Sequence, residues 1–264
     1  MFAKRVLTAA ILLPVFAGAL LFLPQIAWAL FLLPGLATAS VEWADLALMG
    51  PRARYAYGAL VSLSAPAVLY LVPLSHFEAW PYRLSVCFWV LIAPLWLSRH
   101  WSVRNTFVRG LVGWIVLVPM WLALVQLQTT PWTLLLILSI VWVADTAAYA
   151  VGRCWGHRKL APTISPGKSW EGVLGAVAAI GLYYGVLWLT APAGSRLVDA
   201  QYGLLIFVAV LVLSIVGDLF ESLMKRQVGV KDSGQLLPGH GGVLDRIDGL
   251  TSTLPFAALV LYYM

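Results

Sequence analysis

The chain has 264 residues, of which 61% are hydrophobic and 11% are charged, and its mean hydropathy is +0.88. These values lie outside the range of soluble globular domains, so the sequence predicts an integral membrane protein in contact with the lipid bilayer. The formal net charge of +6 is compatible with nucleic-acid binding. Basic connections on one side of a membrane explain the charge better, and we expect no nucleic-acid partner.

Nine apolar stretches are long enough to cross a bilayer, because a hydrocarbon core about 30 Å thick needs about 20 helical residues. In chain order they cover residues 6–24, 26–49, 56–74, 82–98, 110–128, 132–151, 172–192, 202–221 and 249–264. The first stretch has the features of a signal peptide. We expect it to stay as the first helix, because the distribution of charge between the connections depends on it.

The basic residues predict the orientation of these helices. With a cytoplasmic N-terminus, all of the 17 Lys and Arg residues except Arg83 and Arg196 fall on the cytoplasmic side. This asymmetry follows the positive-inside rule. We therefore expect an all-α, polytopic bundle of about nine transmembrane helices in the cytoplasmic (inner) membrane, folded as one domain over residues 1–264.

Two long connections distinguish the second half of this domain, 131–264, from the helices of 1–130. They cover residues 152–171 and 222–248, and both are predicted to lie on the cytoplasmic side. The turns on the other side, such as 128–131, are short. A site that takes substrates from both water and the bilayer is therefore expected on the cytoplasmic face.

The two cysteines, Cys87 and Cys154, are far apart in the sequence, so they provide neither a disulfide framework nor a CxxC pair. Cys154 and His157 form a single C-x-x-H pair. A structural zinc site needs a second pair, so we expect packing roles for the cysteines.

Acidic residues carry the main functional signal, because a carboxylate within a membrane is costly unless it is paired, hydrated or bound to a cation. The chain has only 11. Seven are predicted at the cytoplasmic ends of helices or in the two long connections: Asp145, Glu171, Asp218, Glu221, Asp232, Asp245 and Asp248.

Three of these acids could form a metal site. If a helix begins near Leu244, Asp245 and Asp248 share one of its faces, and Asp218 on the preceding helix could complete the set. Carboxylate oxygens suit Mg²⁺. The alternative is that the acids simply pair with nearby bases such as Arg226, Lys231 and Arg246.

Basic residues and glycines accompany the acids. Lys168, Lys225, Arg226, Lys231 and Arg246 offer positive charge for phosphate groups. The glycines around His240, which are Gly239, Gly241 and Gly242, allow the backbone to approach a phosphate closely. The combination resembles a metal-assisted phosphoryl or nucleotidyl transfer site, and the absence of a GxxxxGK[ST] sequence argues against an ordinary ATPase.

The segment 222–248, SLMKRQVGVKDSGQLLPGHGGVLDRID, resembles the signature of phosphatidate cytidylyltransferases. Every specified position of that signature is met: Lys225-Arg226, Lys231-Asp232, His240-Gly241-Gly242, Asp245-Arg246 and Asp248. Further agreement comes from Asp145-Thr146 with Gly152-Arg153, from the stretch 165–172 (SPGKSWEG), and from Glu42-Trp43. The resemblance covers the C-terminal half specifically and the N-terminal half through hydropathy.

The resemblance implies the roles of individual residues. Asp218, Asp245 and Asp248 would hold a catalytic Mg²⁺, with a second, monovalent cation left open, and Lys231 would act beside them. The substrate-binding set would be Asp145, Ser165, Lys168, Ser169, Glu171, Lys225, Arg226, Asp232, His240, Gly241, Gly242 and Arg246. For His240, a structural role and a substrate-contact or acid–base role are equally open. Glu42 is expected to be structural and to pair with a base from another helix.

The implied reaction joins CTP and phosphatidic acid, both anionic, to give CDP-diacylglycerol and pyrophosphate, and the family also suggests a homodimer. A transporter is the main alternative, but its acids would lie near the bilayer midplane within inverted repeats. A CDP-alcohol phosphatidyltransferase would need a D-G-x-x-A-R pattern that this chain lacks. A non-catalytic scaffold gives no reason for acids and bases to converge.

Overall fold

The computed structural model describes residues 2–71, 79–190, 203–236 and 241–264. Within these ranges the chain forms nine helical rods in the predicted order. They are α1 (Phe2–Phe22), α2 (Gln25–Leu46), α3 (Pro51–Leu71), a continuous rod of α4 (Trp80–Cys87), η1 (Phe88–Ile92) and α5 (Ala93–Arg99), α6 (Thr106–Leu127), α7 (Pro131–Trp155), α8 (Trp170–Thr190), α9 (Gly203–Gln227) and α10 (Leu244–Tyr263).

Six of the described rods are long and apolar enough to cross a bilayer: α2, the rod of α4 to α5, α6, α7, α8 and α9. Helices suit such sequences because every backbone N–H and C=O group is satisfied within the segment. The chain is therefore a membrane protein, as predicted. The number of nine spans and the cytoplasmic N-terminus stay predictions.

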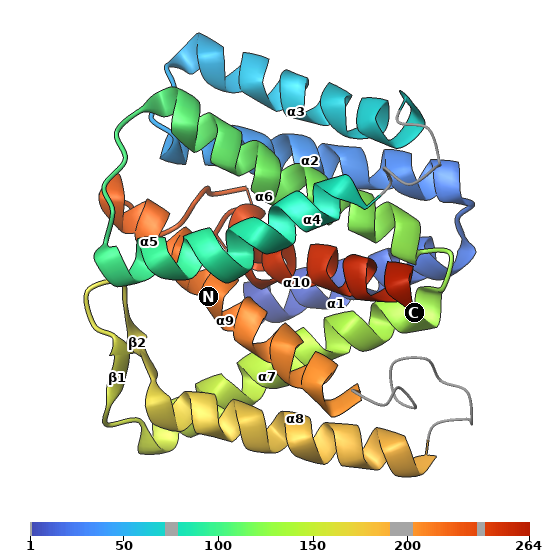
Figure 1. The fold of residues 1–264 in the computed structure, drawn as a ribbon, viewed down its shortest axis with the longest axis vertical. Coiled ribbons are helices and arrows are strands. Elements are labelled where there is room, and N and C mark those ends of the chain that lie inside the picture. The colour runs from blue at the N-terminus through green and yellow to red at the C-terminus, as the bar shows by residue number, and fades with distance from the viewer. Residues whose placement is uncertain (1, 72–78, 191–202, 237–240) are drawn as a thin grey trace.

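The rods run between two opposite ends of the molecule (Figure 1). The connections that follow α2, α5, α7 and α9 gather at the left end of that view, whereas the α1–α2 turn, the α6–α7 turn and the C-terminus lie at the right end. We call the first of these the loop end. All of the loop-end connections were predicted to lie on one side of the membrane.

A π-helical segment, η1, joins α4 to α5. Pro94 follows it and has no N–H to donate, and its ring would clash with a carbonyl one turn earlier in a regular α-helix. The wider π turn accommodates that proline. The rod remains continuous from Trp80 to Arg99, which agrees with a single predicted span at 82–98.

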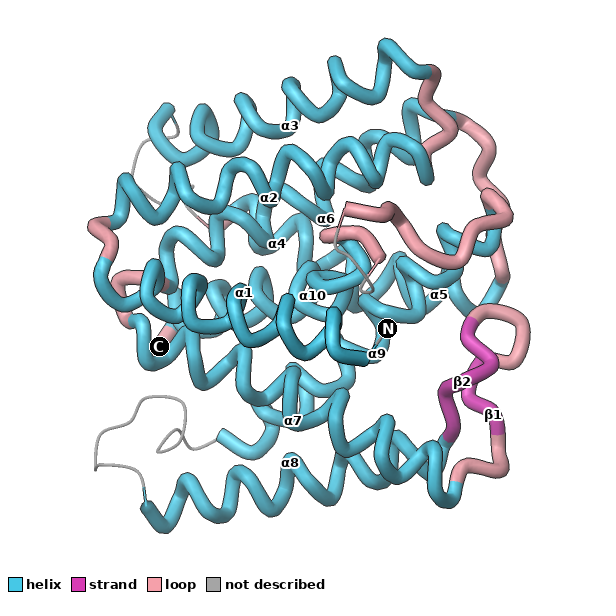
Figure 2. The backbone as a smooth tube through the Cα atoms, turned by 180° about the vertical axis from the view of Figure 1, so that it is seen from behind, coloured by secondary structure: helices cyan, strands magenta, loops and turns pink. Residues whose placement is uncertain are grey.

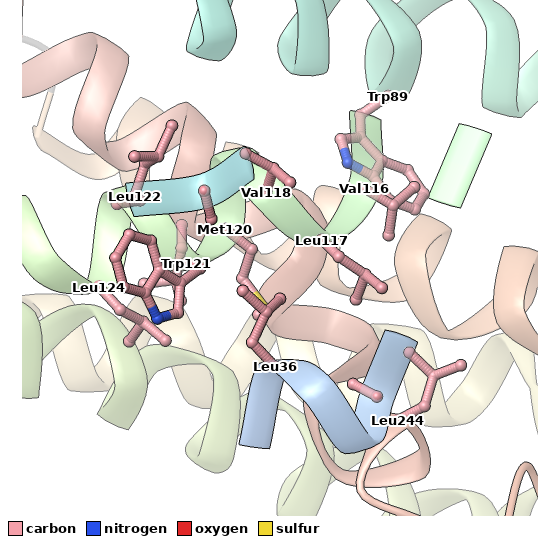
Figure 3. Packing of buried hydrophobic residues seen from close by; sticks show 14 of the residues in the cluster. Leu36, Trp89, Val116, Leu117, Val118, Met120, Trp121, Leu122, Leu124 and Leu244 are labelled. Carbon is pink, nitrogen blue, oxygen red and sulfur yellow. The ribbon is translucent and has the colours of Figure 1, made fainter. Parts of the chain in front are cut away.

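Helix α6 lies at the centre of the apolar core, and most of its residues from Val112 to Leu127 are buried. Figure 3 shows its side chains together with Leu36 of α2, Trp89 of η1 and Leu244 of α10. A second cluster joins α7, α8 and α9 through residues such as Ile140, Ala176 and Phe207. Helices from both halves of the sequence thus pack into one bundle.

The connection 152–171 differs from the expected loop. Helix α7 continues to Trp155, and the strands β1 (Lys159–Ala161) and β2 (Ser165–Ser169) then pair antiparallel before α8 begins. Figure 2 shows this hairpin at the loop end. The all-α prediction missed it, because SPGKS contains Pro and Gly and lacks the alternation of apolar and polar residues that marks a strand.

Helix α9 and helix α10 also extend further than their predicted spans. Helix α9 continues to Gln227, so that Lys225 and Arg226 lie on its last turn, and α10 begins at Leu244. The conditional prediction that a helix begins near Leu244 is therefore confirmed. The extra turns carry charged side chains that hydropathy alone assigned to loops.

Phe220 of α9 is fully buried among the rings of four aromatic residues, Trp43, Phe88, Trp89 and Trp96. We expect Phe220→Ala to lower the free energy of unfolding by about 3 kcal/mol, because it leaves a cavity between α2, α9 and the rod of α4 to α5. Thermal unfolding in detergent measures the effect. Phe107→Ala, at a side chain that is 78% exposed, is the control, and an equal loss in both variants would contradict the prediction.

Candidate active site

A pocket of about 770 Å³ opens between α7, the β-hairpin, α8, α9 and the start of α10. The predicted site residues that line it are Asp145, Ser165, Lys168, Ser169, Asp218, Lys225, Arg226, Lys231, Asp232, Asp245, Arg246 and Asp248. Glu171, Gly241 and Gly242 lie outside this lining, and His240 lies outside the described residues. The fold thus brings both long connections to a single site.

Lys168 and Asp218 join the hairpin to helix α9. The Lys168 Nζ atom lies 2.6 Å from Asp218 Oδ2, and the two side chains are 26% and 33% exposed. Asp145 of α7 and Asp248 of α10 line the same pocket. Asp248 interacts electrostatically with Asp145, Asp218 and Lys168. Three carboxylates from three helices therefore share this part of the pocket with one lysine.

Lys225 forms the second ion-pair centre. Its Nζ atom lies 2.6 Å from Glu221 Oε2 and 2.6 Å from Asp245 Oδ1, and all three side chains are largely buried. The other oxygen of Asp245, Oδ2, accepts hydrogen bonds from the backbone N–H groups of Ser233, at 2.9 Å, and Gly242, at 2.8 Å. Asp245 therefore holds the segment before α10 against helix α9.

Gly241 adopts a positive φ of 82°, and a Cβ atom there would lie 2.6 Å from Asp245 Oδ2. Only glycine combines this backbone conformation with such a close approach. The predicted role of Gly241 in approaching a phosphate is untested, but its packing against Asp245 gives an independent reason for a glycine at this position.

Glu42 reaches the same segment from helix α2. Its side chain is buried, and it accepts hydrogen bonds from the Ser233 hydroxyl at 3.1 Å and from the N–H groups of Val243 at 3.0 Å and Leu244 at 2.8 Å. We expected a basic side chain from another helix as its partner. Two of the three donors are instead backbone N–H groups at the N-terminus of α10, where a negative charge is favourable.

Glu171 has a comparable position in the other connection. Its carboxylate accepts from the backbone N–H groups of His157 and Arg158, at 3.2 Å in each case, just before strand β1. Beside it, the buried hydroxyl of Ser169 accepts from Gly172 N–H at 3.2 Å and caps the start of α8. Both contacts stabilise the base of the hairpin.

Arg153 and Lys159 also line the pocket, although neither belongs to the predicted site. In the sequence, Arg153 belongs to the family resemblance and to the basic residues predicted on the cytoplasmic side, and Lys159 belongs to those basic residues alone. Helix α7 extends beyond its predicted end and carries Arg153, and β1 carries Lys159. The position of Arg153 depends on the additional turn of α7, and that of Lys159 depends on the hairpin; the sequence pattern revealed neither feature.

Metal ligation by Asp218, Asp245 and Asp248 stays a prediction. Among the residues that the structure describes, no group of three or more His, Cys, Asp or Glu side chains is arranged as a ready set of metal ligands. Both oxygens of Asp245 already contact Lys225 or backbone N–H groups. Asp145, Asp218 and Asp248 provide further carboxylate oxygens in the pocket, and their chemistry suits a hard divalent cation.

Some acids of the pocket do pair with bases, but these bases are not the ones that the sequence suggested. Lys168 and Lys225 form the ion pairs of the pocket. None of the ion pairs found in the described ranges involves Arg226, Lys231 or Arg246. Arg226 donates hydrogen bonds to the carbonyl groups of Ile164 and Val230. In the described ranges no carboxylate neutralises any of the three cations, so their charge is available for an anionic ligand.

Comparison with known proteins identifies the family of this chain. Residues 3–264 match the model of the cytidylyltransferase family. The chain belongs to the cytidylyltransferase family. Among its curated relatives is a phosphatidate cytidylyltransferase from Pseudomonas aeruginosa, 40% identical over 98% of this chain and 97% of the relative.

Further relatives of this cytidylyltransferase align over about two thirds of the chain. A phosphatidate cytidylyltransferase from Haemophilus influenzae is 38% identical over 68% of this chain and 67% of the relative. One from Brucella suis is 42% identical over 66% of this chain and 60% of the relative.

The buried ion pairs of Lys225 predict a stability effect in this cytidylyltransferase. Lys225→Met leaves the carboxylates of Glu221 and Asp245 without their cation, and we expect a loss of about 3 kcal/mol in the free energy of unfolding. Thermal unfolding in detergent measures it. Adding Glu221→Gln should restore part of the loss by removing one uncompensated charge, whereas a single variant as stable as the wild type would contradict the prediction.

Proposed function

We propose that this chain transfers the CMP moiety of CTP to phosphatidic acid, giving CDP-diacylglycerol and pyrophosphate. Membership of the cytidylyltransferase family and the names of the relatives support the proposal. The observation that carries it is the pocket at the loop end. There, cations that form no ion pair in the described ranges lie beside a group of carboxylates. That arrangement suits the transfer of a phosphate-linked group between two anionic substrates.

In this reaction an oxygen of the phosphatidate phosphate attacks the α-phosphorus of CTP, and pyrophosphate leaves. The attacking oxygen is already negatively charged, so no covalent protein nucleophile is needed. The protein has to bring the two anions together and to offset the charge on the leaving group. Five cations line the pocket and form no ion pair within the described part of the chain, so they suit this role; they are Arg153, Lys159, Arg226, Lys231 and Arg246.

Asp218 and Asp248 would hold Mg²⁺, with Asp145 beside them, because these carboxylates share one part of the pocket. When bound there, Mg²⁺ would supply positive charge that offsets the negative charge of the substrate phosphates. Lys168 contacts Asp218 Oδ2. To let Asp218 bind the metal, Lys168 would have to move aside or contact only one oxygen of Asp218. Asp245 would mainly position the segment before α10, since its contacts are with Lys225 and the backbone.

We further propose that the loop end faces the cytoplasm from the inner membrane. CTP would reach the pocket from water, and the acyl chains of phosphatidate would stay in the adjacent leaflet. The uneven distribution of the 17 basic residues supports this orientation. The proposed homodimer rests on the family resemblance.

Pyrophosphate release from labelled CTP by the detergent-purified protein tests the reaction. We expect release only with both phosphatidic acid and Mg²⁺, together with an equal amount of CDP-diacylglycerol. Addition of EDTA should abolish it. A folded preparation that releases no pyrophosphate under these conditions would refute the proposed function.

Variants of two aspartates of α10 distinguish a role in metal binding from a role in positioning the loop. Asp248→Asn should lower turnover about 100-fold or more with little loss of thermal stability, because it removes charge and keeps the shape of the side chain. Asp245→Asn should lower both turnover and the unfolding temperature, because it weakens the contact with buried Lys225. Turnover and thermal unfolding are measured on the same samples, and near-normal turnover of Asp248→Asn would exclude its proposed role.

A further inference from the structure

Glu42 connects the N-terminal half of the chain to the pocket without lining it. It lies on α2, and its side chain accepts hydrogen bonds from residues 191 to 202 positions later in the sequence. Its donors, Ser233, Val243 and Leu244, lie in the segment that leads into α10. The first turns of that helix carry Asp245 and Asp248.

The contacts of Glu42 use both carboxylate oxygens. Oε1 accepts from Val243 N–H, and Oε2 accepts from Leu244 N–H and the Ser233 hydroxyl. The N–H groups at the start of a helix have no acceptor within that helix, and the N-terminal end of the helix dipole favours a negative charge. A carboxylate from another helix therefore fixes both the position and the direction of α10.

The glycines of the segment fit this interpretation. A Cβ atom on Gly242 would lie 2.5 Å from Glu42 Oε2, and one on Gly234 would come closer still to Oε1. Any larger residue would displace the carboxylate or the backbone. The chain thus encloses Glu42 on two sides with residues that have no side chain.

We infer that Glu42 is a positioning residue for the reaction: it holds the N-terminus of α10 so that Asp248 and Asp245 keep their places in the pocket. The inference rests on the proposed function and deepens it. Glu42 touches no substrate in this arrangement, because it is buried behind the segment that it binds. The N-terminal half of the chain thereby contributes to catalysis through one side chain.

Glu42→Gln is the sharpest test, because it preserves size and removes charge. An amide has one accepting oxygen, so its NH₂ group must face a backbone N–H of either Val243 or Leu244, which cannot accept. Ser233 can rotate its hydroxyl, but a backbone N–H cannot. We expect about a tenfold fall in kcat and about a fivefold or larger rise in the KM for CTP.

The kinetic pattern separates positioning from loss of folded protein. A smaller folded fraction lowers the apparent kcat and leaves KM unchanged, whereas a displaced segment changes both. Asp45→Asn is the matched control, since Asp45 lies one turn further along α2 and pairs with Arg54 at the surface. It should behave like the wild type in both constants.

Ser233→Ala keeps the test decisive if Glu42→Gln does not fold. It removes one of the donors to Glu42 and leaves both backbone bonds, so a smaller shift in the same direction is expected. Unchanged KM in the folded variants would overturn the inference, provided that the wild type is active. An inactive, folded wild type would instead refute the proposed function.

Discussion

The polar groups at the loop end are constrained by the cost of burying a charge or an N–H group without a partner. In this protein, carboxylates and backbone N–H groups satisfy one another through hydrogen bonds. Glu42 and Asp245 accept from the segment before α10, and Glu171 accepts from the backbone just before β1. Each of the two connections that form the pocket is thereby held by carboxylates, and one of these, Glu42, comes from the distant helix α2.

This constraint divides the charged residues of the pocket into two groups. Lys168 and Lys225 neutralise carboxylates, so their charge is already used within the protein. The pocket arginines and lysines that make no such pair in the described ranges remain available to phosphates. A site built this way can be rigid where it carries its acids and still strongly attractive to anions.

Close packing of helices supports the same arrangement. Gly217 of α9 lies against α10, where a Cβ atom would come within 2.6 Å of Asp248 O, and Gly249 of α10 lies against Ser214 of α9. Small residues let these two helices approach closely, as is common in membrane proteins. The approach brings Asp218 and Asp248, from separate helices, into one pocket.

The sequence alone determined the class of protein, the order and approximate limits of its helices, and most of the charged residues that line the pocket. Hydropathy is a local property, and the signature around Lys225 to Asp248 is a continuous segment, so both can be read without contacts. Only the tertiary structure decided which lysine pairs with which acid, that Glu42 binds a helix N-terminus, that Glu171 supports a hairpin, and that Arg153 and Lys159 enter the pocket. These features join residues up to 202 positions apart, and their energy depends on the distance and direction between groups that sequence spacing does not specify.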